Sequence, residues 1–184
     1  MEPAASALHG LLRAHGATVA VAESLTGGLL GAALTSAAGA SVTFCGGITA
    51  YATPAKVALL GVDEALLVRH GAVHPEVALA MARGARERFA ATYALALTGV
   101  AGPEPQDGQP PGTVHVALVV RRGSRRGRCG WPATGRPCGP APSGLPSSSR
   151  SSRSADPIHG AGRRRDDYSV TLDLAVSVVS LRNL

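Results

Sequence analysis

Short apolar segments alternate with helical segments along the first 120 residues, and this alternation is the feature that most restricts the fold. In the helical segments apolar side chains recur about every three to four residues, whereas the short segments are largely apolar, as in buried strands. Helices that alternate with such strands pack as layers around a sheet. We therefore predict a fold of the α/β class, a single-domain α/β/α sandwich. The expected helices are residues 4–13, 27–37, 55–60 and 75–89, and the expected strands are residues 18–22, 42–51, 93–98 and 112–120.

The composition changes at Arg121. Gly, Pro, Ser and Arg dominate residues 121–165, where no helical or strand period persists, and such a composition predicts disorder. Residues 1–120 carry six Lys+Arg and eight Asp+Glu, whereas residues 121–184 carry twelve and four, so the net charge of +6 belongs to the second part. We predict a domain at residues 1–120, incomplete at its C-terminal end. A largely disordered Arg/Gly/Pro/Ser-rich tail that is not native to the fold follows at residues 121–184.

Composition also limits the classes of partner and site. The three cysteines form no CxxC pair, and the sequence has no secretory segment and no run of the roughly 18 apolar residues that a membrane span needs. We therefore expect a cytoplasmic protein without a membrane partner. The histidines are not spaced with acidic residues as metal ligands are, so we expect no metal and no cofactor. The basic tail lacks interleaved aromatic residues, and we do not expect nucleic acid as the main partner.

The turn AESLTGG places hydroxyl groups and glycines at the carboxyl end of the first expected strand, where α/β sheets usually bind their ligands. Ser24 and Thr26 are able to cap the helix that follows. Gly27 and Gly28 let the free N–H groups of that helix approach an anion, which predicts a cradle for a phosphate or carboxylate. The alternative is a plain helix cap, in which Glu23 serves only the turn.

Lys56 is the only lysine of the chain, against seventeen arginines. Arginine supplies a permanent charge but cannot lose its proton, so a lysine retained in such a sequence indicates an amine that acts as a base. Tyr51, five residues earlier, is placed to orient this amine or to stack on a substrate ring. The alternative is a chance surface lysine.

The turn TGVAGP ends a third apolar segment with a hydroxyl group and two glycines. Thr98, Gly99 and Gly102 therefore predict a turn that presents backbone N–H groups to a developing oxyanion, although a plain strand-to-loop turn fits the same residues. Ser41, in GASVTF, enters an expected strand and by itself indicates only a turn.

Four motifs in this order resemble the CinA C-terminal family. They are AESLTGG, GGITAYATPAKVALLGV, HGAVHPEVALAMARGARERF and LALTGVAGPEPQDGQPPGTVHVAL, and together they cover about residues 5–120. Members of the family are described as amidohydrolases that convert nicotinamide mononucleotide to nicotinate mononucleotide and ammonia in pyridine-nucleotide salvage. The resemblance implies the same reaction on a small nucleotide, without a cofactor, by a homodimer or a higher homo-oligomer.

The resemblance also implies roles for the residues at matching positions. The two serines of the family fall on Ser24 and Ser41, its lysine on Lys56, and the hydroxyl residue of its glycine turn on Thr98. We expect Ser24 to attack the carboxamide carbon after it loses its proton to neutral Lys56, with Ser41 relaying the proton or positioning the pair. Thr98 and the N–H groups of the glycine turn would stabilise the oxyanion, and direct attack by a water held by the same groups stays an alternative.

After residues 112–120 the chain departs from the family, in which a basic strand, a Gly-Asp-Arg turn and a final amphipathic helix follow. Residues 128–140, reverse-translated and read from the third base of the Arg128 codon, permit the string LRLAGDRAAVRA, which contains that turn. We therefore hypothesise a shift of reading frame between about Val120 and Arg128, which resequencing of the coding DNA tests, and we expect weak activity from the chain as written. The alternative functions are a nucleotide-binding module without turnover and a nucleic-acid-binding protein that acts through its basic tail.

Overall fold

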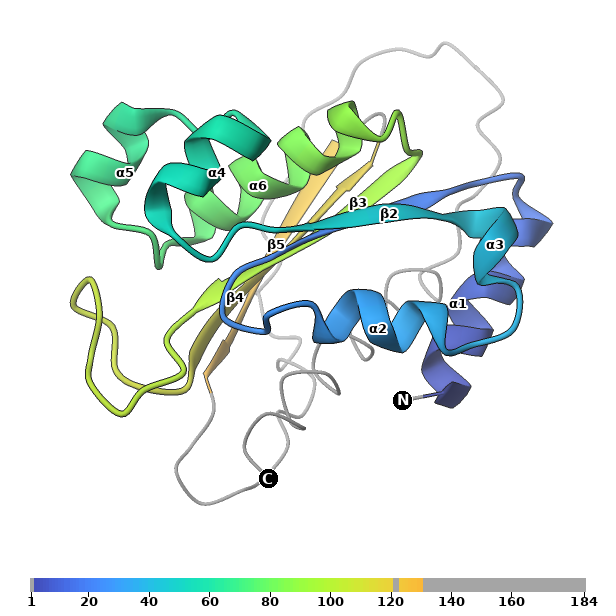
Figure 1. Cartoon of the computed structure of the whole chain (residues 1–184), viewed down its shortest axis with the longest axis horizontal. Coiled ribbons are helices and arrows are strands. Elements are labelled where there is room, and N and C mark those ends of the chain that lie inside the picture. The colour runs from blue at the N-terminus through green and yellow to red at the C-terminus, as the bar shows by residue number, and fades with distance from the viewer. Residues whose placement is uncertain (1, 121–122, 131–184) are drawn as a thin grey trace, which may run out of the picture.

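The computed structural model describes residues 2–120 and 123–130, which share one five-stranded mixed sheet (Figure 1). The strands lie in the order β2-β1-β3-β4-β5. β1 is parallel to both of its neighbours, whereas β4 is antiparallel to β3 and β5 is antiparallel to β4. The strands are β1 (Val19–Glu23), β2 (Phe44–Thr49), β3 (Tyr93–Gly99), β4 (Thr113–Val120) and β5 (Gly123–Gly130).

Helices cover both faces of the sheet (Figure 1). They are α1 (Glu2–Ala14), α2 (Leu29–Thr35), α3 (Ala40–Thr43), α4 (Thr53–Leu60), α5 (Glu64–His70) and α6 (Pro75–Arg88). The first three lie on one face and the last three on the other, and each group encloses its own hydrophobic core. The predicted layered α/β/α fold is thus confirmed for the described residues. None of the helices described there is long and apolar enough to cross a bilayer.

The two faces of the sheet differ in the size of their side chains, because successive residues of a strand point to opposite faces. Val19 and Val21 of β1 belong to the core under α1 and α2. Ala20 and Ala22, the residues between and after them, belong to the core under α6. The short alanine side chains of β1 let α6, with its larger side chains such as Leu79 and Met81, pack against this face of the sheet.

Close packing continues between α6 and α4, the helix that carries Lys56. Gly84 of α6 is buried, and a Cβ at this position would overlap the carbonyl oxygen of Leu60 at the end of α4. Only glycine therefore allows the two helices to approach this closely. The contact determines where α4 lies against α6, and through it the position of Lys56.

Two local differences from the sequence prediction lie outside the sheet. Residues 42–43, expected to begin the strand of residues 42–51, instead end the short helix α3 (Ala40–Thr43), because Gly39 precedes this helix with a positive φ of 96° and turns the chain. The helix α5 was not predicted. It begins after Asp63, whose carboxylate accepts a hydrogen bond of 2.9 Å from the backbone N–H of Ala65, as an N-cap does.

The sheet also continues past Val120, where we predicted the domain to end. β5 pairs antiparallel with β4 along its whole length, from Gly123 opposite Val120 to Gly130 opposite Thr113. The open edge of β4 supplies backbone partners whatever the side chains are, so the composition of residues 123–130 did not reveal this strand. The remainder of the predicted tail, residues 121–122 and 131–184, lies outside the described residues.

Candidate active site

The carboxyl ends of the three parallel strands meet at one edge of the sheet. Glu23, the last residue of β1, is level with Thr49 of β2 and with Leu97 of β3. The residues that follow these strands therefore come together, as is usual for ligand sites in α/β sheets. They line a cavity of about 610 Å³, a volume in the usual range for a small-molecule site.

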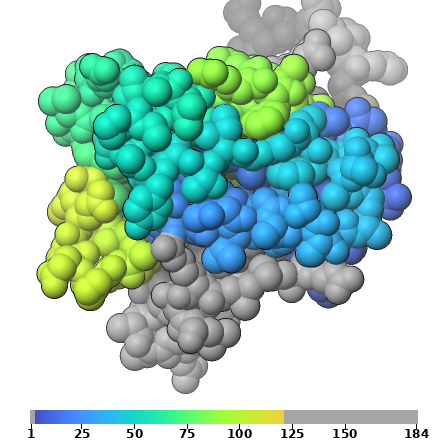
Figure 2. Space-filling view, in the orientation of Figure 1, coloured from blue at the N-terminus to red at the C-terminus, as the bar shows by residue number. Residues whose placement is uncertain are grey.

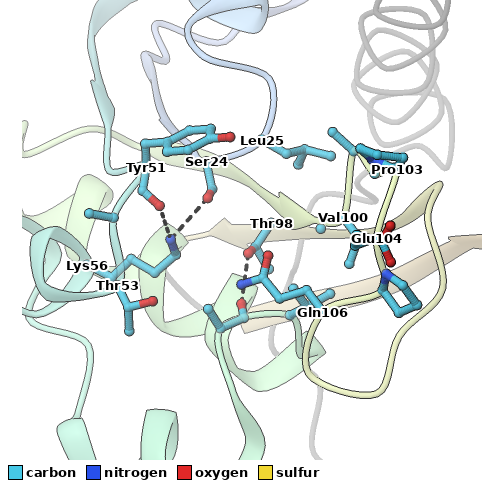
Figure 3. Close-up of a pocket in the computed structure, with 17 residues that line it drawn as sticks. Ser24, Leu25, Tyr51, Thr53, Lys56, Thr98, Val100, Pro103, Glu104 and Gln106 are labelled. Atoms are coloured by element: carbon cyan, nitrogen blue, oxygen red, sulfur yellow. Dashed lines mark hydrogen bonds between the residues drawn. The ribbon is translucent and has the colours of Figure 1, made fainter.

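Ser24 lies on one side of this cavity, directly after β1 (Figure 3). Its backbone N–H donates to the carbonyl oxygen of Leu97 at 3.0 Å, so the chain still pairs with β3 one residue beyond β1. The side chain is 7% exposed. Its hydroxyl group is thus carried by a rigid strand end and faces a space that a ligand can enter, which is the placement a nucleophile needs.

Lys56 is almost completely buried, with 1% of its surface exposed, and its amine points at Ser24 (Figure 3). The Nζ atom lies 3.0 Å from the Ser24 hydroxyl oxygen, and it donates to the carbonyl oxygens of Ala50 at 2.9 Å and Tyr51 at 3.0 Å. A neutral amine has two N–H donors and one lone pair, whereas an ammonium has three donors. Two N–H groups of Lys56 donate to the two carbonyls, so the remaining site on Nζ faces Ser24. This site is a lone pair in the neutral amine and an N–H group in the ammonium.

Burial lowers the pKa of Lys56 below its ordinary value of 10.5, because the charged form loses its hydration. The negative charge of Asp107 acts in the opposite direction and raises this pKa, but burial is the larger effect. The neutral base is therefore more populated near neutral pH than in a lysine at the surface. The buried position of Lys56 thus suits an amine that changes its charge, whereas a chance surface lysine would be exposed.

Thr98, labelled in Figure 3, lines another part of the cavity, together with Gly99 and Gly102. The Thr98 hydroxyl donates to the carbonyl oxygen of Ala72 at 2.8 Å, so its hydrogen points away from a bound carbonyl group. A Cβ at Gly99 would overlap the carbonyl oxygen of Thr113, so glycine is required at this contact between β3 and β4. This wall therefore offers the lone pairs of the Thr98 hydroxyl and the backbone of the turn.

Tyr51 stands at the mouth of the cavity, beside Ser24 (Figure 3). Its side chain is 66% exposed, while its backbone carbonyl holds Lys56 from within. The two roles expected for this residue are thus separated. The backbone orients the amine, and the ring is free to cover a ligand.

Thr26, Gly27 and Gly28 do not line the cavity, and the helix end that we expected to bind a substrate anion is filled by Glu23. The Glu23 carboxylate is 1% exposed. It accepts a hydrogen bond of 2.6 Å from the Thr26 hydroxyl and one of 3.2 Å from the backbone N–H of Gly28. The N–H groups of Leu30 and Gly31 donate to it at 3.0 and 2.8 Å. A side chain of the protein thus takes the place we assigned to a phosphate, which matches the capping alternative.

Ser41 is not brought to Ser24. It is exposed on α3, before the amino end of β2, whereas the cavity lies beyond the carboxyl end of that strand. Six strand residues separate the two ends, and at about 3.3 Å per residue this places Ser41 roughly 20 Å from the cavity. Within the described chain Ser41 therefore cannot relay a proton between Ser24 and Lys56.

Asp107 is a residue near the cavity that our sequence analysis missed. It lies in the exposed loop between β3 and β4, and its carboxylate accepts hydrogen bonds from the backbone N–H groups of Ala72 and Val73 at 2.6 and 3.0 Å. The available signal was the pair Asp107–Gly108, a common tight-turn sequence. Among residues 2–120 and 123–130 no three His, Cys, Asp or Glu side chains gather as a metal-binding group.

Comparison with known proteins places this arrangement in a family. The model of the CinA C-terminal domain matches residues 1–133. A CinA-like protein of Frankia casuarinae is 58% identical over 110 residues, which are 60% of this chain and 25% of that protein. A CinA-like protein of Gloeobacter violaceus is 49% identical over 134 residues, 67% of this chain and 32% of the relative. The chain thus spans about a quarter to a third of the length of these curated relatives.

Solved structures show the same fold. The competence/damage inducible protein CihA from Agrobacterium tumefaciens matches with a TM-score of 0.69 and 38% identity, over 73% of this chain and 83% of that one. A competence-damaged protein (CinA) superfamily protein from Escherichia coli matches with a TM-score of 0.71 and 29% identity, over 100% of this chain and 90% of its own.

Proposed function

The chain belongs to the CinA C-terminal domain family, and from this membership and the geometry of Ser24 and Lys56 we propose that it is an amidohydrolase that converts nicotinamide mononucleotide to nicotinate mononucleotide and ammonia. The observation that carries the proposal is the buried amine held by two backbone carbonyls with its third position on a serine hydroxyl. A serine activated by a base in this way is a nucleophile for carbonyl carbon.

In the proposed first half-reaction, neutral Lys56 takes the proton of the Ser24 hydroxyl as its oxygen attacks the carboxamide carbon. The ammonium of Lys56 then returns this proton to the amide nitrogen, and ammonia leaves as the tetrahedral intermediate collapses to an ester of Ser24. In the second half-reaction water attacks the ester, Lys56 takes a proton from the water, and the same proton returns to Ser24 as the acid is released. The sum is one amide and one water giving one acid and one ammonia.

The opposite wall supplies recognition in this proposal. Because the Thr98 hydrogen is engaged by Ala72, the Thr98 oxygen is an acceptor, and we assign it to the N–H₂ group of the carboxamide. The N–H of Val100 already donates to the carbonyl of Thr113, so we assign the oxyanion to the backbone N–H groups of the next two residues, 101–102. This revises the expectation that the Thr98 hydroxyl itself donates to the oxyanion.

The ring of Tyr51 supports a substrate with a positively charged aromatic ring, such as the pyridinium of nicotinamide mononucleotide, because aromatic faces attract cations. Among the described residues that line the cavity, Lys56 is the only basic one, and its amine is turned toward Ser24. The substrate phosphate therefore gains no cationic partner from these residues. The missing cation supports our expectation of weak activity from the chain as written.

Ammonia release from nicotinamide mononucleotide by the purified chain tests the proposal. We expect stoichiometric ammonia and nicotinate mononucleotide, and loss of both with Ser24→Ala. Rapid quenching during turnover, followed by mass spectrometry, should find the acyl ester on the peptide that contains Ser24. Binding of the nucleotide without ammonia would instead identify a nucleotide-binding module, and ammonia release by the Ser24→Ala variant would identify direct attack by water.

A further inference from the structure

The loop between β3 and β4, residues 100–112, forms one wall of the cavity and projects from the sheet (Figure 1). In Figure 2 it appears in yellow against the green surface of the α4 and α5 region. Its residues 100–106 line the cavity together with Ala72 and Val73, which follow α5. The shape of the cavity therefore depends on how this loop is attached to the segment of residues 71–73.

One side chain makes this attachment. Asp107 Oδ2 accepts hydrogen bonds from the N–H groups of both Ala72 and Val73, 35 and 34 residues away in the sequence. A Cβ at Gly71 would overlap the Asp107 carboxyl group, and Gly71 has a φ of +73° that favours glycine. The Asp107 carboxylate thus occupies a space that is available only because residue 71 has no side chain.

The turn that carries Asp107 is built to present it. The backbone N–H and C=O groups of Gln106 and Gln109 exchange two hydrogen bonds, of 3.1 and 2.8 Å, around Asp107 and Gly108. Both central residues have positive φ, 52° and 70°, as in a tight hairpin turn. Positive φ is unfavourable for a residue with a Cβ, so the two hydrogen bonds of the carboxylate compensate for the conformation of Asp107.

In this position Asp107 affects both Thr98 and Lys56. Ala72, which donates its N–H to Asp107, accepts the Thr98 hydroxyl hydrogen with its carbonyl oxygen, so the two bonds place Thr98 and the loop relative to each other. On the other side of the cavity, the charge of Asp107 acts on Lys56 and opposes the effect of burial on the lysine pKa.

We propose that Asp107 is a positioning residue of this site, a latch that holds the β3–β4 loop on residues 71–73 and keeps the cavity in the shape that binds substrate. The proposal rests on the proposed hydrolase function for its kinetic consequences, but the latch itself does not depend on the identity of the substrate.

The groups that face Lys56 are Ser24 and the carbonyls of residues 50–51, with Glu104 as a second acid in the cavity lining.

Two substitutions separate the effect of the Asp107 hydrogen bonds, which form the latch, from the effect of its negative charge. Asp107→Asn keeps an oxygen that can accept both N–H groups and removes only the charge, whereas Asp107→Ala removes both hydrogen bonds. For Asp107→Ala we expect faster amide hydrogen exchange in the peptide that contains Ala72 and Val73, and about a tenfold or greater fall in kcat/KM, mainly through KM. Glu87→Gln, at an exposed glutamate of α6, is the matched control for the loss of an acid and should leave both measurements unchanged.

For Asp107→Asn we expect native amide hydrogen exchange at Ala72 and Val73 and a KM within about threefold of the original. The acidic limb of the kcat/KM profile should shift to lower pH, since the pKa of Lys56 falls when the neighbouring negative charge is lost. Native exchange in Asp107→Ala would overturn the latch, whether or not the chain releases ammonia. If the chain releases ammonia and Asp107→Ala keeps the original KM, the effect on substrate binding is refuted. If no ammonia is released while exchange increases in Asp107→Ala, the latch stands and the proposed function fails.

Discussion

Two carboxylates hold the two sides of the cavity, and they do so from different environments. Glu23, which precedes Ser24, is buried and accepts four hydrogen bonds from one continuous stretch of chain. Asp107, in the exposed loop whose preceding residues form another wall of the cavity, accepts two hydrogen bonds from a distant segment. Buried polar networks are costly to break, whereas contacts at an exposed loop open at small cost. The reacting pair Ser24 and Lys56 thus lies on the side with the buried network, and the loop wall that carries Asp107 is the side that opens at smaller cost.

The largest effect should come from the rigid side. Lys56→Arg keeps a positive charge but removes the base, because the guanidinium does not lose its proton. We expect kcat to fall by about a thousandfold or more, the usual range for loss of a general base, while circular dichroism stays native. A Lys56→Arg protein with a near-native rate would contradict the role of the amine as proton acceptor. Lys56→Arg should match Ser24→Ala in the size of the loss if the two residues act as one unit.

Urea unfolding measures how much each of the two carboxylates, Glu23 and Asp107, contributes to the free energy of unfolding. Glu23→Ala leaves buried N–H donors without an acceptor, and we expect the free energy of unfolding to fall by about 3 kcal/mol. Asp63→Ala, which removes the exposed cap of α5, should cost about 1 kcal/mol. If Asp107→Ala costs as much as Glu23→Ala, the two sides are equally rigid and the contrast between them is wrong.

The pH dependence of the reaction reports the charge state of Lys56. Only the neutral amine accepts the Ser24 proton, so kcat/KM should rise with pH, about tenfold for each unit below the pKa, and level off above it. Burial lowers the pKa of Lys56, so the rise should end below 10.5. A profile that is still rising at that pH would mean that the amine keeps its ordinary pKa and is not desolvated during catalysis.

The smallest effects should come from the mouth of the cavity. Tyr51 holds Lys56 with its backbone carbonyl, which any residue supplies, so its side chain acts only on the ligand. We expect Tyr51→Phe to change KM by less than about twofold, and Tyr51→Ala to raise it by about fivefold with little change in kcat, as loss of a cation–π contact at an exposed site would. A large fall in kcat for Tyr51→Phe would show that the phenol takes part in the chemistry.

Much of this architecture follows from local patterns. The alternation of helical and strand segments predicts the layers, because each segment carries its own period of apolar residues. Lys56 stands out as the only lysine of the chain. Ser24 directly follows one apolar strand and Thr98 lies near the end of another, so their place at one edge of the sheet also follows from the sequence. β5 was missed because a strand that joins an open edge through its backbone needs no such period.

The sequence by itself determined the class of fold and the polar residues that lie at the carboxyl ends of the strands. It also indicated Ser24 and Lys56 as the pair of residues most suited to the chemistry. Only the tertiary structure decided which anion fills the start of α2, which way the amine of Lys56 points, and that Asp107 is seated on a segment 35 residues away. The reason is physical. A helical or strand period depends on neighbours in the sequence, whereas a hydrogen bond such as that from the backbone N–H of Ala72 to Asp107 depends on how the fold brings two distant segments together.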